Sequence, residues 1–305
     1  MTLDLGRLVS RSFAIAWHHR WLWVLGVFGG VGAGNLNTGN PRGGGQSAAQ
    51  VSRFLNEHLA IVLALVTAIV VIALVAFVVS CVAVPASIWA SLELDAGREV
   101  GLRSAWREGR LRFWRYLRLA LLKGLAVAFV LAVAGVLVAA GTGIYAAGGA
   151  ATIAPLVLLG GILLVVFVLG LIVLALGLTW SERLLVILGL DAVDSLRAGW
   201  WLFRHSKLDT VIVAVVFYVL RLVLTIAITI VALLAALPGI ICVIVYFAGH
   251  AGSLTLLVAG IAWIAVLGGG VEIVGAGFLG ALYQAGYAMA ARDLSVSRGL
   301  QPAAT

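Results

Sequence analysis

The sequence predicts an all-α fold, a polytopic membrane helix bundle, and three observations lead to that class. Hydrophobic residues make up 63% of the 305 residues and charged residues 10%, whereas soluble domains carry about 25% charged residues. A run of 58 residues between Lys123 and Glu182 contains no Asp, Glu, Lys or Arg. A single helix of that length would reach ~87 Å, nearly three hydrocarbon thicknesses. The run must therefore turn and cross the membrane twice.

About six transmembrane helices are expected, one in each long apolar tract. The tracts are Trp21–Gly34, Leu59–Leu92, Leu119–Ala147, Ala154–Trp180, Val211–Ala248 and Leu254–Ala291. The first tract has only 14 residues, which is short for about 30 Å of hydrocarbon. The alternative is five crossings plus a re-entrant segment. Glycine-rich stretches at 141–150 and 249–253 are expected to form the turns between tracts.

The charge distribution predicts the orientation in the membrane. The chain carries 20 Lys+Arg against 12 Asp+Glu, a net charge of +8. Eight basic residues lie in 93–123 and four in 182–209, while 141–153 and 249–253 hold none. Because basic loops stay in the cytoplasm, both termini are predicted to be cytoplasmic. This excess is a topology signal and does not indicate a nucleic-acid surface. The composition, rich in Arg, Gly, Ala and Val, is typical of a bacterial protein, so the inner membrane is expected.

A short motif ending in tryptophan recurs along the chain. Leu102–Trp106 is repeated as Leu196–Trp200, with a fainter copy at Phe13–Trp17. Each copy lies in a basic amphipathic stretch that is followed by two apolar tracts. We therefore predict three parallel repeats, each an interfacial helix plus a transmembrane hairpin. The repeat units are about 1–94, 95–189 and 190–293 of a single membrane domain, 1–305, and 294–305 is expected to be a flexible tail.

The amphipathic stretches are expected to lie in the headgroup plane on the cytoplasmic side. Their apolar faces would turn toward the membrane and their arginines toward anionic lipid. The residues predicted to face lipid are Trp17, Arg103, Trp106, Arg107, Arg110, Arg197, Trp200 and Arg204. The alternative is that these stretches extend the spans into the cytoplasm and that the tryptophans act as belt anchors. Asp191 or Asp194 is expected to cap the third helix.

Three segments resemble a known family. They are Trp17–Gly26, Glu182–Leu188 and Asp194–His205. The layout of most of the chain is similar to uncharacterised bacterial six-helix inner-membrane proteins, which are related to the membrane domain attached to some glycerophosphodiester phosphodiesterases. The resemblance implies a membrane location and no established activity. The phosphodiesterase barrel is a separate soluble domain that this sequence does not encode.

The sequence predicts no catalytic, cofactor or metal site. It contains no GxxxxGK, HExxH or GxSxG motif. His18 and His19 are adjacent and therefore point to different faces of a helix, which makes a poor chelate. Gly26, Gly30 and Gly34 repeat every four residues, a spacing that lets helices approach closely. These glycines are interpreted as packing devices, with a substrate gap as the alternative.

Two ionisable residues, Arg221 and Glu272, lie inside apolar tracts. A charge at mid-membrane costs about 3 kcal/mol or more, so it persists only if it is paired, hydrated or functional. One hypothesis is that the two residues pair inside the bundle, although their expected depths differ by ~12 Å. The other is that Glu272 sits near the outer interface while Arg221 snorkels inward. Glu182 and Arg183 are expected to form an interfacial pair.

Two functions follow from these features. The first is a non-enzymatic integral membrane protein, either a scaffold or subunit of a membrane assembly or a lipid-associated protein. The alternative is a transporter or lipid-handling protein with a pathway near Arg221 and Glu272, where Pro238 and the triple glycine 268–270 are expected to break the last helices. The expected partners are membrane lipids, anionic on the cytoplasmic side, and other proteins of a membrane complex. No nucleic acid and no cofactor is expected.

Overall fold

The computed structural model describes residues 4–31, 59–148, 153–248 and 254–300, and these ranges are helical apart from short connections. The helices are α1 (Leu5–His18), α2 (Trp21–Val31), α4 (Leu59–Asp95), α5 (Leu102–Leu111), α6 (Phe113–Gly148), α7 (Ile153–Leu188), α8 (Ala192–His205), α9 (Lys207–Ala248), α10 (Leu254–Trp263), the π-helix η2 (Ile264–Gly268) and α11 (Gly269–Ser297). Within the described ranges there is no strand, so the predicted all-α class is confirmed for them.

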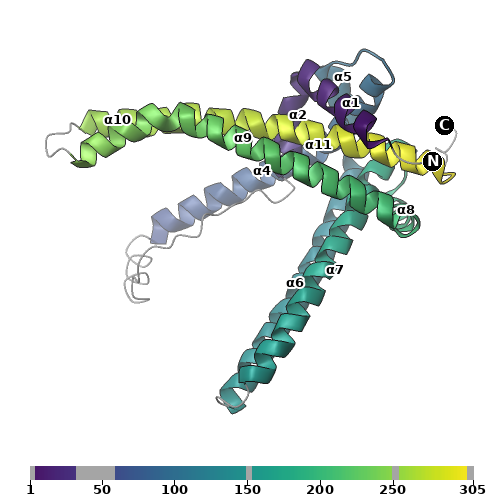
Figure 1. Ribbon diagram of the computed structural model, residues 1–305, viewed down its shortest axis with the longest axis horizontal. Coiled ribbons are helices and arrows are strands. Elements are labelled where there is room, and N and C mark those ends of the chain that lie inside the picture. Colours follow the sequence, from purple (N-terminus) through teal and green to yellow (C-terminus); the bar gives the residue numbers. More distant parts are fainter. Residues whose placement is uncertain (1–3, 32–58, 149–152, 249–253, 301–305) are drawn as a thin grey trace.

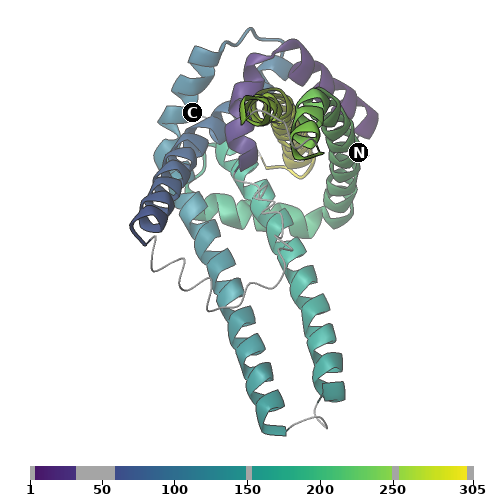
Figure 2. The same ribbon diagram turned by 90° about the vertical axis from the view of Figure 1, so that its left-hand side faces the viewer.

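The helices form a packed base from which three arms diverge. The base contains the short helices α1, α2, α5 and α8 and the adjoining halves of the long helices. The arms are α4, the α6–α7 hairpin and the hairpin of α9 with α10–α11, and they point in different directions (Figure 1). Figure 2 shows the α6–α7 hairpin and α4 standing apart from the α9–α11 hairpin. Both ends of the chain lie at the base (Figure 1).

Five helices are long and apolar enough to cross a membrane: α4, α6, α7, α9 and the continuous helix of α10, η2 and α11. They correspond to five of the six predicted tracts. The first predicted tract, Trp21–Gly34, is represented by the 11 residues of α2, about 16 Å of helix. Residues 32–34 of that tract lie outside the described residues. Helix α2 by itself is therefore too short to cross about 30 Å of hydrocarbon.

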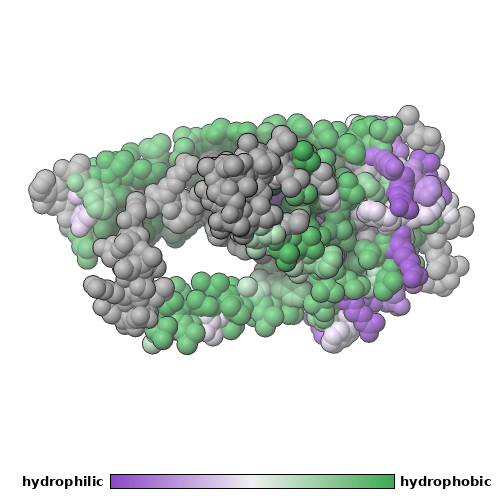
Figure 3. All heavy atoms as spheres, turned by 90° about the horizontal axis from the view of Figure 1, so that it is seen from below, coloured by the Kyte–Doolittle hydropathy of each residue, from purple (hydrophilic) through white to green (hydrophobic). Residues whose placement is uncertain are grey.

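Most buried residues lie in the base. In the arm formed by the last hairpin, small residues are also buried where the two helices touch: Ala232, Ala236, Gly239, Gly260 and Gly268. In α4 the buried residues run from Ser80 to Ser91, whereas residues 59–75 are exposed apart from the half-buried Val62. In α11 burial begins at Gly275 and continues to Ser295. Figure 3 shows the hydrophilic residues gathered at the base end, while the arms are covered with hydrophobic side chains. The base therefore holds the protein core, and the arms present apolar surface on every side.

Each short amphipathic helix packs on the end of a long helix. Helix α5 packs on α4, α8 on α7, and α1 on α11. The residue before the motif tryptophan is small and buried in each case: Ala16, Ala105 and Gly199. A Cβ at Gly199 would come within 2.7 Å of the Ser181 backbone nitrogen. A small residue at this position therefore lets each short helix lie directly against a long one.

Three of the long helices end on a glycine in the left-handed region. Gly97, Gly189 and Gly299 follow α4, α7 and α11, with φ of 78°, 66° and 76°. Within the described ranges they are the residues with positive φ. The caps of α4 and α11 use the same hydrogen bonds: Gly97 N–H to the Leu94 carbonyl and Arg98 N–H to Glu93, Gly299 N–H to Val296 and Leu300 N–H to Ser295. Glycine is favoured at this position because it has no Cβ to clash.

The prediction that Pro238 and the triple glycine 268–270 break the last two helices is wrong. Helix α9 continues through Pro238, and α10 joins α11 through one π-helical turn, η2, at the start of the triple glycine. Trp263 Nε1 donates a hydrogen bond to the Ala235 carbonyl at 3.0 Å, across to α9. Apolar helices tolerate proline and glycine where neighbouring helices hold the backbone. The pairing of α9 with α10–α11 therefore keeps both helices continuous.

The predicted role of small residues in close packing is confirmed for Gly26. A Cβ on Gly26 would collide with the backbone of Gly277 and Ala281 in α11, and one on Gly277 would reach the Trp23 carbonyl at 2.5 Å. Nothing lies within 4 Å of such a Cβ at Gly269 or Gly270. Gly34 lies outside the described residues. Close helix packing thus explains some glycines of the last helix, but it does not explain Gly269 and Gly270.

Candidate functional site

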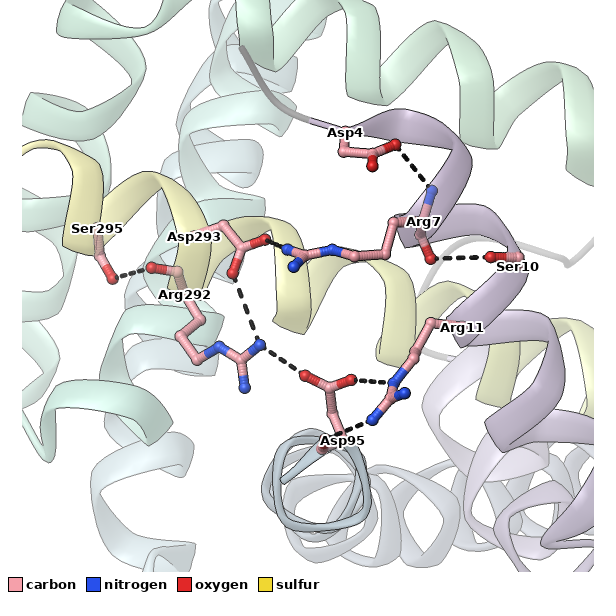
Figure 4. A network of polar contacts seen from close by, with 8 residues as sticks. All are labelled: Asp4, Arg7, Ser10, Arg11, Asp95, Arg292, Asp293 and Ser295. Carbon is pink, nitrogen blue, oxygen red and sulfur yellow. Dashed lines mark hydrogen bonds and ion pairs between the residues drawn. The ribbon is translucent and has the colours of Figure 1, made fainter. Parts of the chain in front are cut away.

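A network of ion pairs closes the base between the first and last helices (Figure 4). Asp95, at the end of α4, accepts from Arg11 Nε of α1 at 2.7 Å and from Arg292 Nη2 of α11 at 2.6 Å. Arg7 Nη2 of α1 donates to Asp293 Oδ2 of α11 at 2.7 Å. One carboxylate thus ties together three helices that lie far apart in the sequence. The arginines of α1 are paired with protein carboxylates here.

A second polar cluster lies inside the base where α6, α7 and α11 meet. The Glu182 carboxylate accepts from Lys123 Nζ, from Arg183 Nη1 at 2.5 Å and from the Tyr116 hydroxyl at 3.1 Å. Arg183 Nη2 donates to Gln284 Oε1 at 2.9 Å. The expectation of an interfacial Glu182–Arg183 pair is incomplete, because the Arg183 side chain is only 2% exposed and reaches a third helix.

Aromatic rings surround the buried guanidinium of Arg183. Its Cζ lies 5.5 Å from the ring centre of Tyr287 and 5.9 Å from that of Tyr283. A cation over an aromatic face is attracted by the ring quadrupole, more strongly when it is removed from water. Arg183 Nε and the Trp180 indole nitrogen, one turn away, have no hydrogen-bond partner. The cluster holds two cations and one carboxylate, so the rings supply part of the stabilisation.

Glu272 lines a groove between the two helices of the last hairpin. The α9 wall consists of Thr229, Ala232, Leu233, Ala236 and Ile240, and the other wall of Ile264, Ala265, Gly268, Gly269 and Glu272. The Glu272 side chain is exposed. Among the described residues no basic nitrogen lies within 4.0 Å of its carboxylate. One acidic group thus stands in an otherwise apolar groove, beside a π-helical turn of the kind often found at functional sites.

Arg221 and Glu272 lie at different levels of the same hairpin. The register is given by Phe217, which packs on Gly286, and by Ile228, which packs on Gly275. Arg221 therefore lies at the level of α11 residue 282, ten residues from Glu272, which is about 15 Å along the helix. The structure does not bring the two together, and no ion pair joins them. The half-buried Arg221 belongs to the base side of the hairpin, whereas Glu272 belongs to the arm.

One hollow on α5 is lined by three arginines and a tryptophan. All four were predicted to face lipid. Arg103, Arg107 and Arg110 lie on the exposed face opposite the buried Ala105, and Trp106, which is half-buried against the core of the base, completes the hollow. The three arginines make no ion pair with the described residues. The side that carries them is therefore open to anions, while the opposite side packs on α4.

The other predicted interfacial residues lie on the outer faces of α1 and α8. Trp17 is 53% exposed and contacts Phe278 edge-on, with ring centroids 6.0 Å apart. The Trp200 ring packs against Gly177, and the Arg204 guanidinium lies 5.9 Å from it. Arg197 is 80% exposed and lies 3.8 Å from Asp194. The cap of α8 is Asp191, whose side chain makes no capping hydrogen bond and instead lies 3.5 Å from Arg115.

Sequence reasoning missed several residues of the buried cluster. Gln284 lies in the alanine- and glycine-rich middle of α11, and its hydrogen bond with Arg183 joins residues 101 positions apart. Tyr116 belongs to a segment that reads as an amphipathic loop. An available signal was the spacing of Lys123 and Glu182 at the two ends of the charge-free run, since a symmetric hairpin brings the two ends together.

The described ranges contain no group of three His, Cys, Asp or Glu side chains placed to hold a metal ion. The described residues offer instead one solvent-exposed and one buried ionic network that fix the base, a basic face on α5 without ion pairs, and an acidic groove in one arm. Comparison with protein-family models, with curated proteins and with solved structures found no match.

Proposed function

We propose that this chain is a non-enzymatic scaffold of the bacterial cytoplasmic membrane, built from three repeats around a closed ring. The observation that carries the proposal is the division between a packed base and exposed arms. The core helices are locked by ionic networks, whereas the arms offer apolar side chains on every face. Such surface suits contact with lipid tails and with transmembrane helices of other proteins.

The packing order supports the threefold repeat. Each short helix packs on the last long helix of the preceding unit: α5 on α4, α8 on α7, and α1 on α11, which closes the circle. The cap glycines Gly97, Gly189 and Gly299 end the corresponding long helix of each unit. The buried small residue before each motif tryptophan is the third shared feature. Three equivalent positions in three units are the signature of an internal repeat.

The buried cluster supports a position for the membrane. Helix α6 runs 25 residues from Lys123 to Gly148, about 38 Å, and the last hairpin runs 30 residues from Gln284 to Leu254, about 45 Å. A bilayer with its headgroups is about 40–45 Å thick. We therefore place the cluster at the cytoplasmic boundary of the bilayer and the arm tips at the outer boundary. The base then lies on the cytoplasmic side.

Six crossings are consistent with this placement. Gly29 of α2 lies against Gln284, so α2 ends at the cytoplasmic boundary. Leu59, where α4 begins, lies at the tip of an arm. The five long helices then cross the bilayer, and the sixth predicted crossing, Trp21–Gly34, extends beyond Val31, where the described residues stop before Leu59. Both ends of the chain then lie in the cytoplasm, and the basic face of α5 lies near anionic headgroups of that leaflet.

The scaffold function is tested by cross-linking from the arms. A photo-reactive amino acid is placed at Ile72 of α4, Leu164 of α7 or Ile230 of α9, which are 68%, 61% and 53% exposed. Arg197 on the base, with 80% side-chain exposure, is the control position. We expect adducts of defined mass with one set of membrane proteins from arm positions in native membranes, and none of these adducts from Arg197. Lipid adducts alone at every arm position would contradict the proposal.

A lipid-handling protein is the second candidate, and the Glu272 groove is the observation that favours it. A groove inside the bilayer can hold an apolar molecule that carries one polar group. This function predicts a stoichiometric lipid that co-purifies with the chain and is lost when Gly269→Leu fills the groove. Mass spectrometry of the purified protein in mild detergent separates the two functions.

A further inference from the structure

The Glu272 groove has the shape of a seat for a helix. Its α9 wall extends from Thr229 to Ile240, 11 residues or about 16 Å, which is three helical turns. Its floor is made of small residues, because Ala232 and Ala236 pack directly against Gly268. Small residues one turn apart, such as Ala232 and Ala236, are common where transmembrane helices pack closely.

The wall opposite α9 has a gap that nothing in the described chain fills. A Cβ on Gly269 would meet no atom within 4 Å, although Gly269 lines the groove. Glycine at this position makes the helix less stable than alanine would. The missing side chain does not allow a closer contact with any described residue. The missing side chain leaves space for an outside group beside Glu272.

The depth of Glu272 limits what can reach it. Glu272 precedes Gln284 by 12 residues, about 18 Å along α11. With the buried cluster at the cytoplasmic boundary, this carboxyl group stands close to the middle of the bilayer. The headgroup of an ordinary phospholipid stays at the surface and does not reach this depth. A basic side chain on a transmembrane helix does, because the helix itself carries it there.

We propose that this groove is the docking site of a transmembrane helix from a different protein, which presents a Lys or Arg side chain to Glu272. Each charge alone is unfavourable in hydrocarbon, and pairing relieves both. Among the described residues, the arm segments at the level of Glu272 carry no Lys or Arg, so the described helices of a second copy do not supply the cation. The proposal rests on the scaffold function and names the chemistry of one partner.

The test uses a synthetic helix as the partner. The probe is a 21-residue Leu/Ala transmembrane peptide with a single central Lys, and the comparison peptide carries Leu at the centre. The full-length protein is placed in phosphatidylcholine vesicles with a fluorescent acceptor at the arm tip, and energy transfer from labelled peptide gives the affinity. We expect the Lys peptide to bind about tenfold more tightly than the Leu peptide.

Two sets of variants make the result specific. Glu272→Gln is expected to abolish the preference for the Lys peptide, and Glu272→Lys is expected to transfer it to a peptide with a central Glu. Gly269→Leu, which fills the groove, is expected to block binding, while the matched variant Gly270→Leu, open but outside the groove, is expected to leave it unchanged.

Equal binding of the Lys and Leu peptides would overturn the proposal, as would equal effects of the two glycine variants. Cross-linking of two copies of this chain through the groove would also overturn it. The scaffold function stands or falls separately, because the cross-links from Ile72 and Leu164 do not involve the groove.

Discussion

Arg183 illustrates how single residues fix the base. Its guanidinium bonds to Glu182 beside it and to Gln284 on another helix, and it lies over two tyrosine rings. Buried charges are costly unless paired, and removing one partner leaves an uncompensated charge. The cluster therefore fixes the relative position of α6, α7 and α11 more narrowly than apolar packing alone would.

Glu182→Gln should destabilise the protein strongly. The change leaves the cations of Lys123 and Arg183 without their carboxylate, a loss of about 3–5 kcal/mol in soluble proteins and less where water or lipid headgroups relieve it. Asp194→Asn is the matched control, because its partner Arg197 is 80% exposed, and it should cost less than about 0.5 kcal/mol. Equilibrium unfolding in mixed micelles measures both, and equal effects would show that the cluster is not structural.

At the scale of the helices, the glycines that end the long helices determine where the chain turns. Gly97, Gly189 and Gly299 turn the chain at the base, so that the next short helix can lie across the end of the long one. Because glycine alone adopts positive φ without strain, the position of each cap fixes where α5 and α8 begin.

Alanine at each cap should destabilise the base by about 1–2 kcal/mol, the cost of holding an L-residue in the left-handed region. Gly124→Ala is the control, because Gly124 lies inside α6, does not have positive φ, and nothing lies within 4 Å of its added Cβ. Thermal unfolding of the four purified variants in one detergent gives the comparison. A control that loses as much stability as the three caps would rule out this explanation.

The arginines of α5 should recruit anionic lipid. Replacing Arg103, Arg107 and Arg110 by Glu should remove most of the excess of phosphatidylglycerol that co-purifies from mixed vesicles, since each basic residue near such a surface contributes about 1 kcal/mol. The same change at Arg7, Arg11 and Arg292, which are paired with carboxylates, should disturb folding instead. Native mass spectrometry counts the bound lipids, and unchanged lipid binding in the α5 variant would refute the assignment.

The sequence predicted the helices better than their partners. Apolar tracts and charge-free runs located five long helices within a few residues, because helix length and hydropathy are local properties. The apolar face predicted for α1 includes Leu8 and Ala16, which are buried against protein, and Phe13 and Trp17, which are exposed. A lipid-facing surface and a protein-facing surface are both apolar, so periodicity cannot separate them. Contacts such as Arg183 with Gln284 depend on how distant hairpins meet, which no local pattern encodes.

At the scale of the whole molecule, the proposed placement puts the base and the arm tips on opposite sides of the bilayer. In that placement the base extends the long helices beyond the hydrocarbon, so distances counted from Asp209 and Arg292 do not measure depth in the bilayer. They still predict the separation of Arg221 from Glu272, ~12 Å against about 15 Å along the hairpin. The buried cluster is the better reference for depth.

Cysteines at Arg197 and Leu254 should react with a membrane-impermeant reagent from opposite sides. Both side chains are exposed, at 80% and 69%, and the native Cys81 and Cys242 are first replaced by alanine. Arg197 should label only in inside-out vesicles and Leu254 only in intact cells. Labelling of both from the same side would contradict the six-crossing arrangement.

The contact of α1 with α11 has a consequence for how the protein is made. The surface against which α1 packs is part of α11, the last helix. About 250 residues separate His18 at the end of α1 from Gly269 at the start of α11. At roughly 5–20 residues per second, a ribosome needs about 10–50 s to synthesise that interval. During this time α1 has its contacts with α2 and α4 but lacks its larger contact with α11, so part of its buried face stays uncovered until synthesis reaches α11. A chain interrupted before Arg292 and Asp293 would leave the ring open, and the quality-control proteases of the membrane would meet it as an unfinished protein.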